Sequence, residues 1–153
     1  MRDRGLKGEN VIVLGGGLVG CETALYLADQ GKKVTLVELL DQLLLTVDHA
    51  LNNHMSLMAR IDRSDIKVMC STKALSIADG KLSVETPEGR IDLEFDKLVL
   101  AVGYKADTSF SEHLKGKIKK VITIGDNIKA AKVIDAVHAG YNTARLLEDI
   151  RTY

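Results

Sequence analysis

Six consecutive residues near the amino terminus have the types and spacing that can bind the pyrophosphate of a dinucleotide. They are Gly15, Gly16, Gly17, Leu18, Val19 and Gly20, a G-x-G-x-x-G pattern. In such a pattern Gly15 permits a tight turn, Gly17 leaves room for the pyrophosphate, and Gly20 lets a helix pack close to the strands. Free N–H groups at the helix amino terminus then face the anion. A glycine-rich turn that binds nothing is the alternative.

An acidic residue follows at the distance expected of a ribose ligand. Glu38 lies 18 residues after Gly20, at the end of an apolar run, close to the ~20 residues typical of dinucleotide-binding domains. Its carboxylate can accept hydrogen bonds from ribose hydroxyls and would repel a 2′-phosphate. Leu39 and Leu40 come next, so no adjacent arginine could hold that phosphate, and we expect NAD(H) to be preferred over NADP(H). Two alternatives remain: a surface glutamate that ends a strand, and a basic residue from elsewhere that reverses the preference.

Two residues beside the glycine-rich segment carry reactive groups. Glu22 is expected in the first turn of the following helix, where it either interacts with the helix dipole or lies near the nicotinamide end of the cofactor. Cys21 is near the same helix terminus, which lowers a thiol pKa. Cys70 is 49 residues away, so the two cysteines do not have the spacing of a redox motif. We therefore expect Cys21 to be a packing residue, with a catalytic thiol as the alternative. The histidines lack metal-ligand spacing, so we expect neither a metal site nor a catalytic residue in this chain.

The elements that must position these residues indicate an α/β fold. The run 11–14 predicts a buried strand, the segment from Leu18 to Gly31 a helix, and 34–37 a second strand parallel to the first. Further strands are expected at 66–70, 73–79, 81–86, 90–95, 97–102 and 121–126, and further helices from Asp48 to about Ile61 and from about Ala130 to Ile150. The turns Asp79-Gly80 and Pro87-Glu88-Gly89 predict an antiparallel three-stranded meander beside a Rossmann-like parallel sheet.

Length and composition set the broad class. The chain has 153 residues, of which 46% are hydrophobic and 27% charged, which is typical of one soluble globular domain. Basic and acidic residues number 21 each, which argues against a nucleic-acid partner. No apolar run reaches the ~20 residues of a membrane span. The first ten residues lack an apolar signal region and the chain has only two cysteines, so we expect a cytoplasmic protein.

Two stretches resemble a known family. VIVLGGGLVGCETALYLADQGKKVTLVE resembles the NAD(P)H-binding domain of the pyridine nucleotide–disulfide oxidoreductase superfamily. Together with GDNIKAAKVIDAVHAGYNTA, it is most similar to the C-terminal part of bacterial 2-enoate reductases and 2,4-dienoyl-CoA reductases, which are NADH:flavin oxidoreductases of the old yellow enzyme type. The resemblance covers roughly residues 9–148. It implies an NAD(P)H domain inserted within the FAD domain of a longer flavoenzyme.

The resemblance also implies cofactor residues later in the chain. Ala101-Val102-Gly103-Tyr104 matches an A-x-G motif on the returning strand, where Gly103 would allow the backbone to approach NADH. The segment 122–126 matches an apolar strand ending in Gly-Asp, so Gly125 and Asp126 would contact FAD in the parent enzyme. From the residues alone, Asp126 could instead be a turn residue at the end of a strand.

The chain departs from this family in holding one glycine-rich loop only, with no barrel for FMN and no cysteine cluster for iron–sulfur. We therefore expect an NAD(H)-binding domain at 9–103, a linker at 104–120, and the C-terminal strand and helix of an incomplete FAD domain at 121–150. The remainder of the parent enzyme would hold most of the FAD, and any FMN or iron–sulfur cluster. The apolar stripe of the last helix needs cover, either on residues 1–103 or in a homodimer.

These expectations define one preferred function and two alternatives. In the preferred one, the domain positions NADH for hydride transfer to FAD in a parent that reduces an activated C=C bond, and the isolated chain is inactive. The same domain could belong to a disulfide reductase or an NADH oxidase. A stand-alone, non-enzymatic dinucleotide-binding module is the third, and the Gly-Asp segment counts against it.

Overall fold

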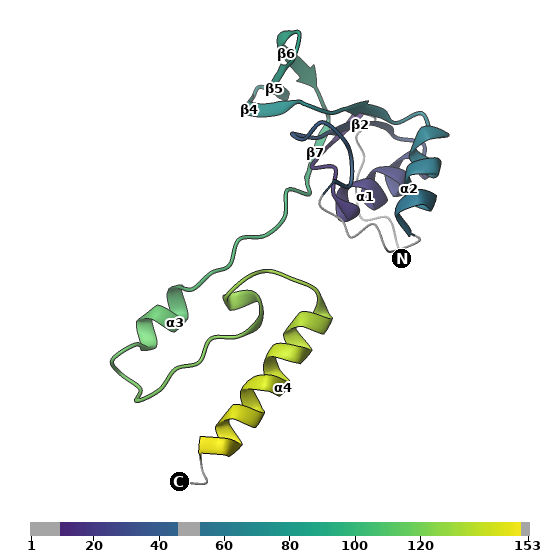
Figure 1. The fold of residues 1–153 in the computed structure, drawn as a ribbon. Coiled ribbons are helices and arrows are strands. Elements are labelled where there is room, and N and C mark those ends of the chain that lie inside the picture. Colours follow the sequence, from purple (N-terminus) through teal and green to yellow (C-terminus); the bar gives the residue numbers. More distant parts are fainter. Residues whose placement is uncertain (1–9, 46–52, 151–153) are drawn as a thin grey trace. The chain divides into compact units, whose positions relative to one another are not determined.

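The computed structural model describes residues 10–45 and 53–150, so the helix start expected at Asp48 lies outside the described residues. The chain divides into two compact units, an N-terminal unit that ends at Gly103 and a C-terminal unit that begins at Tyr104. Figure 1 labels the elements of both units.

A four-stranded parallel sheet forms the centre of the N-terminal unit. Its strands lie in the order β3-β2-β1-β7, with the bounds β1 Asn10–Leu14, β2 Lys33–Val37, β3 Lys67–Met69 and β7 Lys97–Leu100. Helix α1 (Leu18–Asp29) connects β1 to β2, and Asn10 pairs in register with Lys33. Helix α2 (Asn53–Asp62) precedes β3. The strand–helix–strand unit predicted from the sequence is confirmed.

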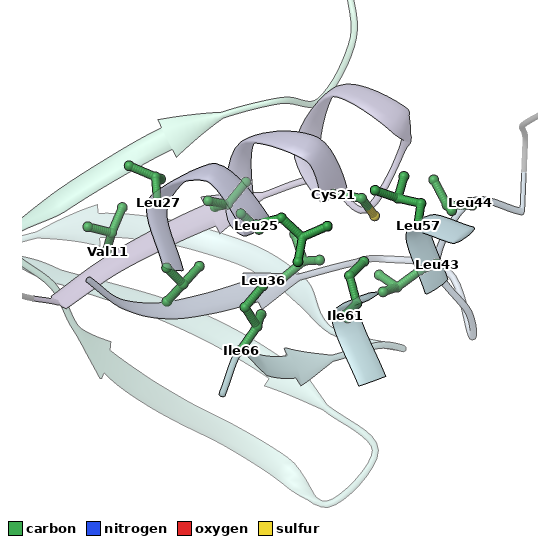
Figure 2. Packing of buried hydrophobic residues seen from close by; sticks show 13 residues of the cluster. Val11, Cys21, Leu25, Leu27, Leu36, Leu43, Leu44, Leu57, Ile61 and Ile66 are labelled. Carbon is green, nitrogen blue, oxygen red and sulfur yellow. The ribbon is translucent and has the colours of Figure 1, made fainter. Parts of the chain in front are cut away.

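Helices α1 and α2 cover one face of the parallel sheet. Alternate residues of a strand point to opposite faces, and Val11 and Val13 of β1 pack on this side against Leu25 of α1 and Ile61 of α2. Figure 2 shows Val11, Leu25 and Ile61 among the side chains of this cluster. The segment after β2 contributes two more buried residues, Leu43 and Leu44, which close the core beside α2.

The opposite face of the sheet packs on the antiparallel meander. Its strands are β4 (Lys73–Ala78), β5 (Lys81–Thr86) and β6 (Gly89–Glu94). Ile12 and Val37 of the parallel sheet pack there against Leu82 and Val84 of β5. The β4–β5 turn has positive φ at both central residues, 49° at Asp79 and 72° at Gly80, the geometry that favours Asp-Gly in two-residue hairpins. The predicted meander is confirmed.

The C-terminal unit differs from the prediction in two ways. Residues 104–120, expected as an irregular linker, contain the short helix α3 (Ser109–Leu114). Residues 121–126, expected as a strand, pair with no strand in the part of the chain that the structure describes, and Gly125–Asn127 form a 3₁₀ turn instead. The physical reason is that an extended apolar segment becomes a strand only where a neighbouring strand takes its backbone hydrogen bonds.

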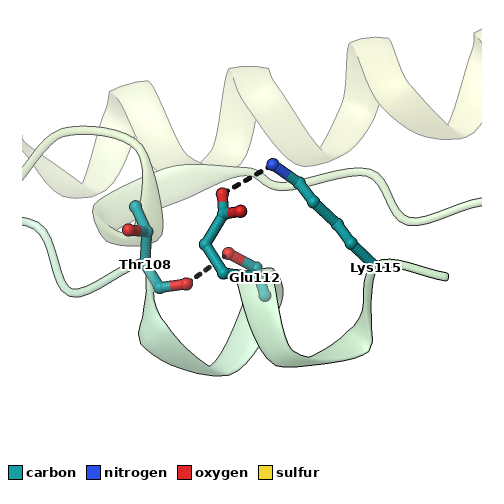
Figure 3. A network of polar contacts seen from close by, with 4 residues as sticks. Thr108, Glu112 and Lys115 are labelled. Carbon is teal, nitrogen blue, oxygen red and sulfur yellow. Dashed lines mark hydrogen bonds and ion pairs between the residues drawn. The ribbon is translucent and has the colours of Figure 1, made fainter. Parts of the chain in front are cut away.

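Polar contacts lie at both ends of α3. The carboxylate of Asp107 accepts a hydrogen bond from the backbone N–H of Ser109 at 3.0 Å, and hydrogen bonds from Ser109 lower the pKa of Asp107. The N–H of Glu112 donates to the carbonyl oxygen of Thr108 at 2.9 Å, and Lys115 Nζ lies 2.6 Å from Glu112 Oε1 (Figure 3). These contacts are local and exposed, which fits a short helix in a polar segment.

Helix α4 (Val133–Ile150) ends the described chain and carries the predicted apolar stripe. Val133, Val137 and Tyr141 on this stripe are 82%, 57% and 62% exposed. Nothing within the described part of the C-terminal unit therefore covers this face. No described helix is both long enough and apolar enough to cross a membrane.

Candidate functional site

A cleft of about 690 Å³ lies at the carboxyl ends of the parallel strands. The segments that follow β1, β2, β3 and β7 line it, and they include Gly17, Glu38, Thr72 and Gly103. Open α/β sheets bind their ligands at this end. A second cleft, of about 640 Å³, lies at the amino ends around Asn10 and contains none of the predicted site residues.

The glycine-rich turn between β1 and α1 is packed too closely for side chains at two positions. Gly15 has a φ of 111°, and a Cβ atom there would lie 2.4 Å from the carbonyl oxygen of Ala101, the residue that follows β7. A Cβ atom at Gly20 would lie 1.8 Å from the carbonyl oxygen of Gly15. These contacts let α1 approach β1 and β7 closely, so both glycines are required by the packing of backbone on backbone.

Gly17 differs from those two glycines because it faces open space. A Cβ atom there would meet nothing within 4 Å, and Gly17 lines the cleft. It is the N-cap residue of α1 and provides no side-chain cap, so the first N–H groups of the helix lack the usual partner. Leu18 and Val19, which begin α1, also line the cleft. This is the arrangement that an anionic group needs at a helix amino terminus.

The carboxylate of Glu38 is held by two backbone donors at the edge of the cleft. Its Oε2 accepts a hydrogen bond from the N–H of Gly16, and its Oε1 accepts one from the N–H of Leu40 at 2.8 Å. A carboxylate has about four acceptor positions, so two remain for ligand hydroxyls. Among the described residues lining the cleft, Lys73 is the one basic side chain. A basic residue from elsewhere in the fold could reverse the preference for NAD(H), and Lys73 is the candidate for that role.

Backbone contacts not foreseen from the sequence join three loops at this cleft. The N–H of Leu44 donates to the carbonyl oxygen of Gly16 at 2.9 Å, and the N–H of Thr72 donates to that of Glu38 at 2.8 Å. Thr72 also lines the cleft. The sequence gives only a weak indication that Thr72 lies at this cleft, because a polar residue just after the third strand has no fixed spacing from the glycine-rich segment.

Of two other predicted site residues in the N-terminal unit, Gly103 lies at the cleft and Glu22 does not. Gly103 lines the cleft and has a φ of 87°, a backbone conformation that favours glycine. Glu22 was expected in the first helical turn, but α1 begins at Leu18, so Glu22 lies in the second turn. Its side chain is exposed and is not among the residues that line the cleft.

Cys21 lies in the hydrophobic core rather than at the cleft surface. It is fully buried, and its Sγ donates to the carbonyl oxygen of Gly16 at 3.4 Å. Burial, and secondarily the negative charge of Glu38, raises the pKa of Cys21 to about 12. Burial also raises the pKa of Cys70. The helix terminus therefore does not activate the Cys21 thiol, which agrees with its interpretation as a packing residue.

Gly125 and Asp126 lie in the C-terminal unit, in the turn that precedes α4. Gly125 has a φ of 62°, and Asp126 Oδ1 accepts a hydrogen bond from the N–H of Ala131 at 3.3 Å. Asp126 is exposed and acts here as a turn residue. Within the described ranges, no three His, Cys, Asp or Glu side chains are grouped closely enough to hold a metal ion.

The parallel sheet, the meander and the glycine-rich turn place the N-terminal unit in the class of Rossmann-like domains. A family model described as pyridine nucleotide-disulphide oxidoreductase matches residues 2–140, and the chain belongs to this family. The expected superfamily is thereby confirmed.

Similar proteins fall in the expected part of that family. The chain is 35% identical over 140 residues to an NADH oxidase of Thermoanaerobacter brockii, covering 90% of this chain and 21% of that protein. It is 33% identical over 148 residues to a cinnamate reductase of Clostridium sporogenes, covering 95% and 22%. A solved structure of 2-naphthoyl-CoA reductase is 28% identical with a TM-score of 0.73, covering 87% and 20%. The chain thus spans about a fifth of these relatives.

Proposed function

We propose that this chain is the NADH-binding domain of a larger flavin-dependent oxidoreductase, in which it positions the nicotinamide for hydride transfer to FAD. The observation that carries the proposal is one cleft in which the open backbone at Gly17 and the oriented carboxylate of Glu38 occur together. A pyrophosphate and a ribose need these two groups at neighbouring positions.

The residues of the chain would bind and orient the dinucleotide. The uncapped N–H groups of Leu18 and Val19 would hold the pyrophosphate. Glu38 would accept hydrogen bonds from the ribose hydroxyls through its two remaining acceptor positions. The backbone at Gly103 would allow close approach of the cofactor. When bound, NADH supplies the hydride that FAD accepts, and the protein contributes binding, orientation and electrostatics.

The partner of the domain would be the remainder of a longer parent chain. In support, the relatives it matches are about five times longer, and the stripe of α4 is exposed. We assign the cover of this stripe to the rest of an FAD domain, in which Gly125 and Asp126 would contact FAD. The cinnamate reductase and the 2-naphthoyl-CoA reductase favour a parent that reduces an activated C=C bond.

A second candidate is a parent that is an NADH oxidase, since the relative from Thermoanaerobacter brockii carries that name at 35% identity. The cleft would bind NADH in the same way in both cases. The two candidate parents differ in their electron acceptor, so the full-length parent should be assayed with NADH and either cinnamate or dioxygen. Enoate reduction faster than oxygen consumption supports the first candidate, and the reverse supports the second.

Fluorescence titration of the 153-residue chain with NADH and with FAD, followed by an assay with NADH and cinnamate, tests the domain function. We expect NADH binding, little FAD binding and no turnover. Turnover by the chain alone, or FAD binding tighter than NADH binding, would contradict the proposal.

A further inference from the structure

The turn that follows β3 holds the segment on which Glu38 is mounted. The N–H of Ser71 donates to the carbonyl oxygen of Leu40 at 2.7 Å, and the N–H of Thr72 donates to that of Glu38 at 2.8 Å. In the opposite direction, the N–H of Glu38 donates to the carbonyl oxygen of Met69 at 2.8 Å. Three backbone hydrogen bonds therefore fix the path of residues 38–40, and that path directs the Glu38 side chain.

The conformation of this turn is unfavourable in itself. Ser71 has a φ of 49°, in the left-handed region that residues with a Cβ atom rarely adopt. Such a conformation persists only where surrounding contacts enforce it. The contact that spans Ser71 comes from the next residue: Thr72 Oγ1 donates to the carbonyl oxygen of Cys70 at 2.8 Å.

Thr72 is unusual among the residues around it because its hydroxyl is removed from solvent. Among the described residues, Thr72 and Ser111 are the polar residues that are buried, and Thr72 is only 2% exposed. A buried hydroxyl is stable only with a hydrogen-bond partner. The bond to Cys70 is therefore maintained, and with it the turn that carries the bonds to Leu40 and Glu38.

From these contacts we infer that Thr72 is a positioning residue for dinucleotide recognition and acts through Glu38. Its hydroxyl closes the turn, the turn fixes the backbone of Glu38 and Leu40, and that backbone directs the carboxylate toward Gly16 and the cleft. This inference rests on the proposed function, since it concerns the same cleft. It adds that coenzyme preference depends on a hydroxyl two strands away from the glycine-rich turn.

The test measures the dissociation constants of NADH and NADPH for the 153-residue chain and its variants by calorimetry. In T72V the size of the side chain is kept and the hydroxyl is lost, whereas T72S keeps the hydroxyl. We expect T72V to lower the preference for NADH over NADPH about fivefold, the effect of one hydrogen bond. T72S should retain the preference of the unchanged chain. If T72V does not fold, T72C replaces it, because a thiol is only a weak donor.

Two controls separate positioning from general loss of stability. Ser64 Oγ donates to the carbonyl oxygen of Ile61 at 2.7 Å after α2, at the amino ends of the strands, so S64A should lower the melting temperature without changing the preference. In an E38Q background, T72V should have no further effect on the preference, because the group through which it acts is already altered.

The possible results distinguish failure of the inference about Thr72 from failure of the proposed function. An unchanged preference in folded T72V, an equal loss in T72S, or the same loss in S64A would overturn the inference while leaving the proposed function intact. Failure of the unchanged chain to bind either nucleotide would instead overturn the proposed function, and this inference with it.

Discussion

The Glu38 carboxylate accepts a hydrogen bond from the backbone N–H of Gly16, joining the end of β2 to the glycine-rich turn. A second bond, from the N–H of Leu40 at 2.8 Å, fixes the other carboxylate oxygen. The acid predicted as a ribose ligand therefore also orders the loop predicted to bind the pyrophosphate. Because these hydrogen bonds hold the two parts of the candidate site together, they should reduce the ordering cost of binding.

Replacing Glu38 by glutamine should weaken NADH binding and reduce discrimination against NADPH. One carboxylate oxygen becomes an NH₂ group, which cannot accept from Gly16 or Leu40, and the repulsion of a 2′-phosphate disappears. We expect the NADH dissociation constant in E38Q to rise about tenfold, as for a lost charge-assisted hydrogen bond. The matched control is E88Q, on the exposed β5–β6 turn. Equal NADH affinity in E38Q and the unchanged chain would contradict the role of Glu38.

A side chain at Gly17 should block binding while leaving the fold intact. The Cβ position is open and faces the cleft, and the φ of −73° is accessible to any residue. In G17V we expect NADH affinity to fall more than tenfold, with a stability loss of about 1 kcal/mol from the poorer N-cap. As a control, G31A should lose about 1 kcal/mol or more at its φ of 75° and bind NADH normally. Titration and thermal unfolding of both variants distinguish these effects.

At Gly20 the expected effect is on the fold itself. A Cβ atom would lie 1.8 Å from the backbone oxygen of Gly15, and no flexible side chain can move to relieve this contact. G20A should therefore lower the free energy of unfolding by about 3 kcal/mol. In contrast, G140A in α4 meets nothing within 4 Å and should stabilise its helix by up to about 1 kcal/mol. Urea unfolding gives both values, and near-equal stability of G20A and the unchanged chain would refute the packing role.

Both thiols should be unreactive in the folded chain. Burial raises the pKa of Cys21 from 9.0 to about 12 and raises the pKa of Cys70, so neither forms a thiolate at neutral pH. Iodoacetamide labelling at pH 8, followed by mass spectrometry, should modify both slowly until urea is added. The raised pKa also makes the stability of the fold depend on pH, because the folded state favours the neutral thiol. The free energy of unfolding should therefore be unaffected by Cys21 below pH 9 and should decrease as the pH rises from 9 toward 12. Rapid labelling of Cys21 in the native chain would contradict its burial.

The strand–helix–strand unit and the meander could be predicted because their signals are local. Val11 to Leu14 is a β-branched run ending in glycines, and Asp79-Gly80 is a two-residue hairpin turn. Such patterns determine local structure over a few residues and depend little on contacts with the rest of the chain. The positions of Gly17 and Glu38 at the same cleft followed from this topology alone.

The segments that could not be predicted depend on contacts between distant residues. The run 121–126 has the composition of a strand, but pairing partners decide whether one forms, and none is present among the described residues. Leu44 joins the core and bonds to Gly16 through a backbone bend with a φ of 59°, for which the sequence offers no turn signal. The turn at Ser71 and Thr72 was unforeseen for the same reason.

Calorimetric titration of the 153-residue chain with NADH and then with NADPH tests the central claim most directly, because it measures binding at the cleft without the rest of a parent enzyme. We expect one NADH site per chain, weaker binding of NADPH, and loss of the NADH signal in G17V. Absence of NADH binding by the folded chain, or equal affinities for NADH and NADPH, would contradict it.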